Sequence, residues 1–191
     1  MNLFIKPHAG RYFSMEAMQK IKCLTIEDSN FPDRLRKLSG MPKKLYYIGN
    51  LPDPKKPAAA VVGARMCSPY GRCQAFKYAR TMASYGVQII SGMARGIDAE
   101  GHKGALDTDT PTFAVLGSGV DVCYPNSNRW LYQRILEKGG GIISELPPGS
   151  PPVNWAFPAR NRIISGLSDA VLVVEAKEQS GSLITANFAL E

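Results

Sequence analysis

The stretch that decides the fold reads Ala58-Ala59-Ala60-Val61-Val62-Gly63-Ala64-Arg65-Met66-Cys67-Ser68-Pro69. Its first half is a short run of small and β-branched apolar residues, which is typical of a strand buried on both faces of a parallel sheet. Its last two residues favour a helix start, because a serine side chain can cap the first turn and proline needs no backbone donor there. The stretch therefore predicts a strand over 58–63 and a helix from Pro69 to about Tyr85.

The same alternation of strand and helix continues along the sequence with short connections. Further strands are expected over 87–91, 112–116, 141–144 and 170–175, and further helices over 94–106, 128–138, the segment carrying Arg160 and Arg162, and 182–191. This pattern predicts an α/β fold, a doubly wound and mostly parallel sheet with helices on both faces, of the extended Rossmann-like type. In the strand order 3-2-1-4-5, the first and fourth of these strands would lie side by side, with their following loops flanking one crevice.

Two regions are expected along the chain. Residues 1–57 consist of short apolar groups interrupted by prolines, and they end in a stiff stretch with Pro52, Pro54 and Pro57. We interpret them as a small N-terminal lead-in and linker. Residues 58–191 form the Rossmann-like core.

Composition indicates a globular, basic protein. Hydrophobic residues make up 45% and charged residues 20% of the 191 residues, and the formal net charge of +7 makes a polyanion a plausible partner. The four cysteines form no CxxC pair, so neither a zinc site nor a disulfide framework is expected, and free thiols fit a reducing cytosol. We find no signal peptide and no run of roughly 18 apolar residues. The expectation is a cytoplasmic protein with no metal, no cofactor and no membrane association.

Arginines occupy an unusual place after the proline-rich loop that ends at Pro158. Arg160, Asn161 and Arg162 open an apolar helix, where the positive end of the helix dipole disfavours cations unless an anion binds. Gly63 and Arg65 form a second anion-friendly loop, which lacks the glycine pattern of a dinucleotide fold or a Walker loop. We expect the two loops to close on one anionic ligand. The alternative is a glycine required by a tight turn and a surface arginine.

Aromatic residues accompany these arginines. Trp155 and Phe157 lie beside them in the sequence, and single-stranded nucleic acid needs aromatic faces for its bases and positive charge for its phosphates. The alternative is that both rings pack the loop against the sheet.

Other polar residues follow predicted strands. Asp98 and His102 lie four residues apart on one helix face and could pair, either for acid/base chemistry or, more commonly, to anchor the helix. A third anion-friendly turn runs from Ser180 to Thr185. The carboxylates at the ends of strands could serve a hydrolase or simply close loops, and they are Asp121, Glu145 and Glu175.

Taken together, five ordered motifs resemble the DprA/Smf family, the DNA-processing proteins of bacterial transformation. In chain order they are Val62-Gly63-Ala64-Arg65; Ser91-Gly92-Met93-Ala94-Arg95-Gly96-Ile97-Asp98 through His102; Val115-Leu116-Gly117-Ser118-Gly119-Val120-Asp121 with Tyr124-Pro125 and Asn128; Ser144-Glu145 with Phe157-Pro158-x-Arg160-Asn161-Arg162; and Val174-Glu175-Ala176 with Ser180 to Ala186. The resemblance extends over roughly residues 25–191. The family continues past the position of Glu191 into another strand, so the natural protein is expected to be longer.

The resemblance implies a protein without enzymatic activity that binds incoming single-stranded DNA and hands it to the RecA recombinase, usually as a homodimer. No catalytic residue is implied. The DNA-binding positions that it implies are Gly63, Arg65, Gly92, Phe157, Arg160, Asn161, Arg162 and Ser182.

Two alternatives share the same crevice. One is a nucleotide or nucleoside phosphoribohydrolase similar to the lysine-decarboxylase-like (LOG) family, working through Glu145 or Asp121, although the Pro-Gly-Gly-x-Gly-Thr-x-x-Glu motif of that family is absent. The other is a sensor for a small nucleotide.

Overall fold

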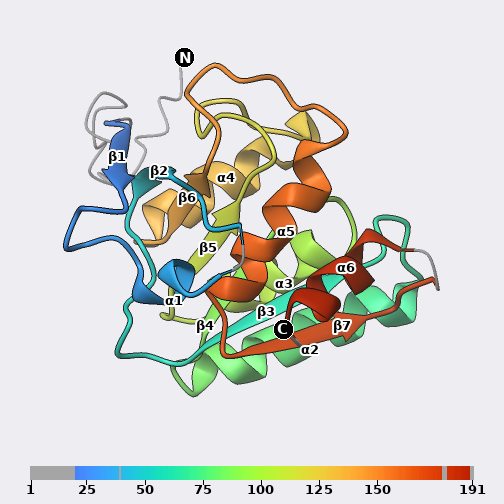
Figure 1. Ribbon diagram of the computed structural model, residues 1–191. Coiled ribbons are helices and arrows are strands. Elements are labelled where there is room, and N and C mark those ends of the chain that lie inside the picture. The colour runs from blue at the N-terminus through green and yellow to red at the C-terminus, as the bar shows by residue number, and fades with distance from the viewer. Residues whose placement is uncertain (1–19, 39, 178–179, 190–191) are drawn as a thin grey trace, which may run out of the picture.

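The computed structural model describes residues 20–38, 40–177 and 180–189. Within these residues, seven strands form one sheet in the order β1-β2-β6-β5-β4-β3-β7 (Figure 1). Their bounds are β1 Lys22–Thr25, β2 Lys44–Gly49, β3 Ala58–Gly63, β4 Gln88–Ser91, β5 Thr112–Val115, β6 Gly141–Ser144 and β7 Ala170–Val174. The strands from β6 to β7 in this order are parallel, whereas β1 and β2 are antiparallel to their neighbours. The predicted α/β fold class is confirmed.

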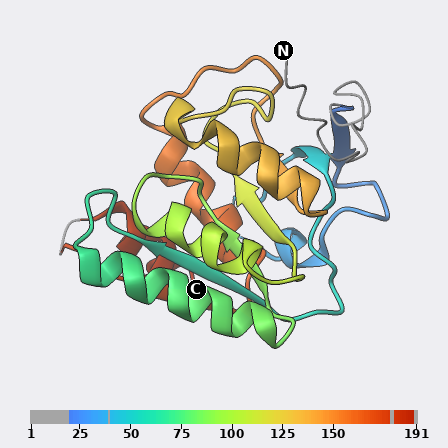
Figure 2. The same ribbon diagram turned by 180° about the vertical axis from the view of Figure 1, so that it is seen from behind.

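Helices cover both faces of the sheet. Three of them lie on the face seen in front in Figure 2, and three lie on the face seen in Figure 1. The first group is α2 Pro69–Ser84, α3 Ile97–Leu106 and α4 Arg129–Glu137, which follows a single 3-10 turn, Asn126–Asn128; the second is α1 Asp33–Arg36, α5 Ala156–Gly166 and α6 Gly181–Phe188. Among these residues no helix combines the length and the apolar character that a membrane crossing requires.

Strand β3 illustrates why the sheet is buried on both faces. Ala60 and Val62 pack in a cluster with residues of α1 and α5, while Ala59 and Val61 pack with the alanines of α2. Successive side chains of a strand point to opposite faces, so an uninterrupted apolar run is the pattern that two covered faces require. The start of α2 is also as predicted, because the Ser68 side chain accepts a hydrogen bond from the backbone N–H of Gly71 at 3.0 Å.

The assumed strand order was wrong. β3 lies between β4 and β7, and β6 is separated from it by β4 and β5. The reason is that β3, β4, β5 and β6 follow one another in a single direction, connected by α2, α3 and α4 on one face. Only then does α5 cross the other face and return the chain to β7 beside β3 (Figure 1). A right-handed crossover can place the next strand on either side of the preceding one. The alternation of strands and helices in the sequence therefore does not distinguish the two strand orders.

The lead-in contributes to the same sheet. β2 pairs antiparallel with β6, and β1 pairs with β2. Phe31, just before α1, and Leu35, within it, are fully buried against α5 and the sheet. Residues 1–19 lie outside the described part of the chain, and the boundary near residue 57 stays a prediction.

Candidate functional site

A cavity of about 380 Å³ lies at the carboxyl ends of the parallel strands. Its walls come from the loop after β3, the first turns of α5 and the start of α6. Six of the eight residues predicted to form the site line it, and they are Gly63, Arg65, Phe157, Arg160, Asn161 and Ser182. The two loops that were expected to meet therefore do so, although their strands are not neighbours. They meet because α5 crosses the sheet face between β6 and β7. Ile163 and Ile164 pack there in a cluster with residues of β3, β4 and β5, and the first turns of the helix reach the loop after β3.

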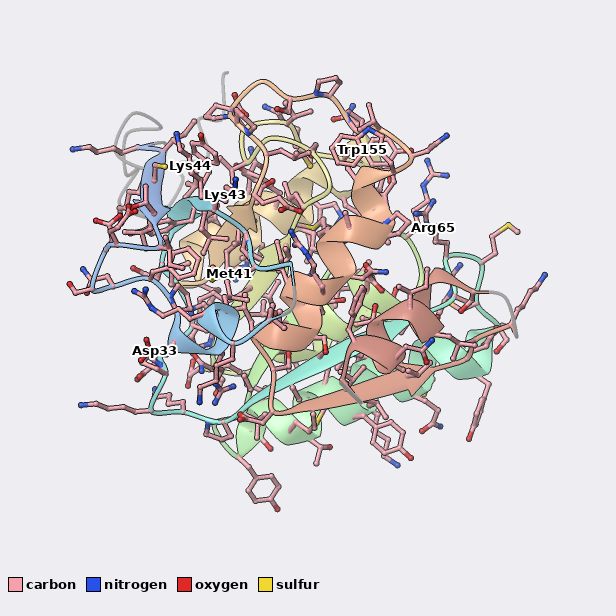
Figure 3. The ribbon with its side chains drawn as sticks, in the orientation of Figure 1. Asp33, Met41, Lys43, Lys44, Arg65 and Trp155 are labelled. Carbon is pink, nitrogen blue, oxygen red and sulfur yellow. The ribbon has the colours of Figure 1, made fainter. Side chains whose placement is uncertain are left out.

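Arg65 and Phe157 form the mouth of this cavity. The Arg65 side chain is exposed, and its guanidinium carbon lies 5.3 Å from the centroid of the Phe157 ring. The Tyr124 ring lies 5.5 Å from the same ring. Figure 3 shows Arg65 projecting from the loop after β3, with Trp155 at the start of α5. Trp155 is 64% exposed and lines no part of the cavity, so it neither packs the loop nor faces the ligand space.

Arg160 occupies a different environment from the one expected. The helix begins at Ala156, so Arg160 lies in its second turn, and the side chain is only 5% exposed. Its Nη1 donates to the carbonyl oxygens of Gly92, at 2.7 Å, and Val115. Carbonyls from the ends of two strands therefore offset its charge, and the conflict with the helix dipole inferred from the sequence does not arise.

Gly92 permits this contact. A Cβ at this position would lie 2.4 Å from Nη1 of Arg160, too close for the guanidinium to reach the strand ends. Gly63 is comparably restricted, because a Cβ there would lie 1.9 Å from the carbonyl oxygen of Val174 in the adjacent strand. The neighbouring backbone thus requires Gly63 and the buried guanidinium of Arg160 requires Gly92, independently of any ligand.

Asp98 and His102 do not pair with each other. A carboxylate oxygen of Asp98 accepts hydrogen bonds from the backbone N–H groups of Gly92 (3.1 Å) and Ala94 (3.4 Å). Burial raises the Asp98 pKa, and the charge of Arg160 partly opposes this. His102 Nδ1 instead lies 2.8 Å from the hydroxyl of Thr112, whose own proton goes to the carbonyl of Ile89. Asp98 therefore holds the loop after β4, and His102 anchors α3 to the sheet.

Burial lowers the pKa of His102 to about 3, with a smaller contribution from the charge of Arg160. We expect the free energy of unfolding to decrease on acidification for this reason. The unfolded chain, with an ordinary value of 6.5, binds more protons between these two values, so the contribution is complete above 6.5 and is lost as the pH falls toward 3. Asp98 acts in the opposite direction, because its raised pKa favours the folded state at low pH.

Urea unfolding of the wild type and of His102→Gln, measured near neutral pH and in mild acid, separates the contribution of His102 to the pH dependence of stability from that of Asp98. The wild type should lose more stability on acidification than the variant does. An equal loss in both proteins would contradict the role of His102.

The remaining predicted residues join elements at the edge of the cavity. Asn161 donates its side-chain amide to the carbonyl of Gly181 at 2.9 Å and so ties α5 to α6. Ser182 is buried at the start of α6, with its hydroxyl 2.5 Å from that of Ser180. Arg162 does not line the cavity; it pairs with Glu145 at 2.5 Å, and both side chains are largely buried.

The other two carboxylates considered from the sequence also close loops. Asp121 accepts the backbone N–H of Gly149 at 2.8 Å, and Glu175 accepts both the N–H and the hydroxyl of Ser68. The bonds from Ser68 lower the Glu175 pKa. Neither these carboxylates nor Glu145 lines the cavity.

Sequence reasoning did not assign Arg95 or Tyr124 to the site. Both line a second hollow of about 540 Å³, which shares Arg65, Phe157 and Arg160 with the cavity. Both residues stand within the quoted motifs, so the signal was present. Their side chains were not singled out because a loop sequence does not show which way a side chain points.

Comparison with known proteins assigns the chain to a family. A family model described as DNA recombination-mediator protein A matches residues 22–191. The DNA processing protein DprA of Streptococcus pneumoniae is 41% identical over 187 residues, which are 95% of this chain and 66% of that protein, and protein Smf of Escherichia coli is 46% identical over 165 residues, 86% and 44% respectively. The chain spans about half the length of the first curated relatives it matches.

Two solved structures share the fold. The crystal structure of the S. pneumoniae protein superimposes with a TM-score of 0.83 at 41% identity, covering 92% of this chain and 61% of that chain. The structure of DNA processing protein A from Helicobacter pylori, a protein that binds single-stranded DNA, gives a TM-score of 0.78 at 32% identity, covering 89% and 76%.

Proposed function

Since this chain belongs to the DNA recombination-mediator protein A family, we propose that it binds single-stranded DNA at the cavity beneath Arg65 and Phe157. The observation that carries the proposal is the pairing of an exposed guanidinium with an aromatic ring at the cavity mouth. A phosphate can bind the guanidinium while a base stacks on a ring, and every base has a π-face, so such a site tolerates any sequence.

The charges around the mouth support an anionic ligand. Arg65 and Arg95 are exposed, and neither forms a salt bridge with another described residue. Burial and the charge of Arg65 lower the pKa of Arg160 to about 10, a shift that Asp98 opposes, so Arg160 is still charged at neutral pH. The cavity is therefore positive at its mouth, whereas deeper inside the charge of Arg160 lies near the carboxyl of Asp98, which also lines the cavity.

We assign different parts to the predicted residues. Arg65 contacts phosphate, and Phe157 stacks on a base. Arg160, Asn161 and Arg162 act through the loops that they hold, because each of them donates a hydrogen bond to another segment of the protein. The contacts of the strand-end carboxylates favour such a binding protein over a hydrolase, since these groups close loops and lie outside the cavity.

Replacing Phe157 with leucine should lower the affinity for single-stranded DNA by about 5- to 150-fold, because base–aromatic stacking contributes roughly 1–3 kcal/mol. Leucine keeps the apolar packing against Gly117 and Tyr124 without offering a π-face. Phe157→Tyr is the matched control and should bind nearly as well as the wild type. The measurement is fluorescence anisotropy with a labelled oligonucleotide.

Competition in the same assay tests the ligand class. Single-stranded DNA should displace the label at low concentration, and duplex DNA and mononucleotides should displace it poorly. Efficient displacement by a mononucleotide would instead identify a nucleotide sensor. Release of free base from nucleoside monophosphates would identify a hydrolase.

We further propose that the protein protects incoming DNA and helps to load the RecA recombinase onto it, acting as a homodimer in transformation or recombination. The family description, DNA recombination-mediator protein A, supports the part of this proposal that concerns recombination. The rate of recombinase assembly on single-stranded DNA, with and without the protein, measures loading, and sedimentation measures the dimer.

A further inference from the structure

A third hollow, also of about 540 Å³, continues from Arg65 across the ends of α2 and α3. These helices lie on the face shown in Figure 2. The hollow shares Arg65 and Arg95 with the preceding one, so the three spaces adjoin along the carboxyl edge of the strands. Its basic side chains are Arg65, Arg72, Arg95 and Lys103.

The charge of this third hollow is only partly compensated. Its lining carboxylate, Glu100, pairs with Lys103 at 2.7 Å. Arg65, Arg72 and Arg95 are exposed, and within the described residues none of them forms a salt bridge. Three neighbouring cations without counter-charges produce a positive potential that attracts an extended anion.

An exposed aromatic ring lies next to Lys103, one of the residues that line the hollow. Trp130 lies in the first turn of α4 and is 51% exposed, and the ammonium nitrogen of Lys103 lies 5.7 Å from its ring centroid. The arrangement repeats the one at the cavity mouth, where Arg65 lies over Phe157. The edge of the sheet therefore carries two pairs of cation and aromatic ring, and the exposed Arg72 and Arg95 line the same hollow as the two cations.

We infer that a single strand bound in the cavity continues past Arg65, over Arg95 and Arg72, and that one of its bases stacks on Trp130. This inference rests on the proposed function and extends it, because it adds a second base-binding position on the opposite face of the sheet from α5. The occupant is single-stranded nucleic acid, since a run of phosphates matches the row of cations and a free base matches the exposed ring. A duplex, with its bases stacked inside, offers no face to Trp130.

The test uses thymidine oligonucleotides of increasing length with the wild type and with Trp130→Ala and Trp130→Phe. Short oligonucleotides, which fill only the cavity, should bind all three proteins equally. Above a threshold length the wild type should gain affinity, Trp130→Ala should lose about 5- to 150-fold relative to it, and Trp130→Phe should recover most of the loss. Equal affinities of the three proteins at every length would overturn the inference.

Tryptophan fluorescence gives an independent readout. The chain has two tryptophans, so Trp155→Phe leaves Trp130 as the sole emitter. Oligonucleotides above the threshold length should quench this emission, and shorter ones should bind without quenching it. Binding of long oligonucleotides without quenching would overturn the inference while leaving the proposed function intact. If the wild type failed to bind any oligonucleotide, the proposed function itself would fail.

Discussion

Replacing Arg160 with methionine should lower the free energy of unfolding by about 3–5 kcal/mol, the usual cost of removing one partner from a buried charged network. The guanidinium is the donor for the carbonyls of Gly92 and Val115, which a methionine would leave without it. Asp98 would also lose the nearby positive charge that opposes the effect of its burial. For a chain of this size the loss corresponds to a fall in Tm of roughly 6–20 °C.

The double variant Asp98→Asn/Arg160→Met is the control for this explanation. Removing the buried carboxyl together with the arginine should cost less than the sum of the two single changes, since the network couples them. Additive losses, or a loss below about 1 kcal/mol for Arg160→Met alone, which is the range of an exposed pair, would show that Arg160 is not part of a buried network. Chemical denaturation of the four proteins measures both quantities.

Replacing Arg65 with glutamine should have the opposite profile, with a large effect on DNA binding and little effect on stability. A charge-assisted hydrogen bond contributes about 1.5–3 kcal/mol, so the affinity for single-stranded DNA should fall about 10- to 150-fold. The slope of log affinity against log salt concentration should become shallower by about 0.7, because one phosphate contact is lost. The side chain is exposed, so the unfolding midpoint should hardly change.

Arg65→Lys separates charge from shape. Lysine retains the positive charge, so the salt slope should return to that of the wild type. Lysine cannot form the two parallel hydrogen bonds that a guanidinium makes to a phosphate, and it has no planar group to stack on Phe157. The affinity should therefore recover only in part. A slope unchanged in Arg65→Gln would show that Arg65 makes no phosphate contact.

The local elements were predictable because their signals are local. The apolar run of β3 and the cap at Ser68 each depend on a few consecutive residues, and both were confirmed. The strand order was not predictable in this way. It depends on where α5 returns the chain, and no residue of α5 specifies whether the next strand joins β6 or β3.

The meeting of the two loops was predicted, but on a wrong basis. Arg65, Phe157 and Arg160 line one cavity as expected, although the strand adjacency from which this was inferred does not exist. The burial of Arg160, which was predicted to contact DNA as Arg65 was, could not be foreseen. Its guanidinium binds the carbonyls of Gly92, directly after β4, and Val115, in β5, and those residues lie far from it in the sequence. A sequence shows the charge of a side chain but not the carbonyls that will surround it.

The return of the chain from β6 to β7 also affects how the protein is made. β3 is complete at Gly63, but its second neighbour, β7, starts only at Ala170, about a hundred residues later. At a translation rate of about 5–20 residues per second, one edge of this apolar strand stays without its final partner for roughly 5–20 s. Such an edge can pair with other chains in the meantime. The nascent protein therefore has an interval during synthesis in which chaperone binding should protect it from aggregation.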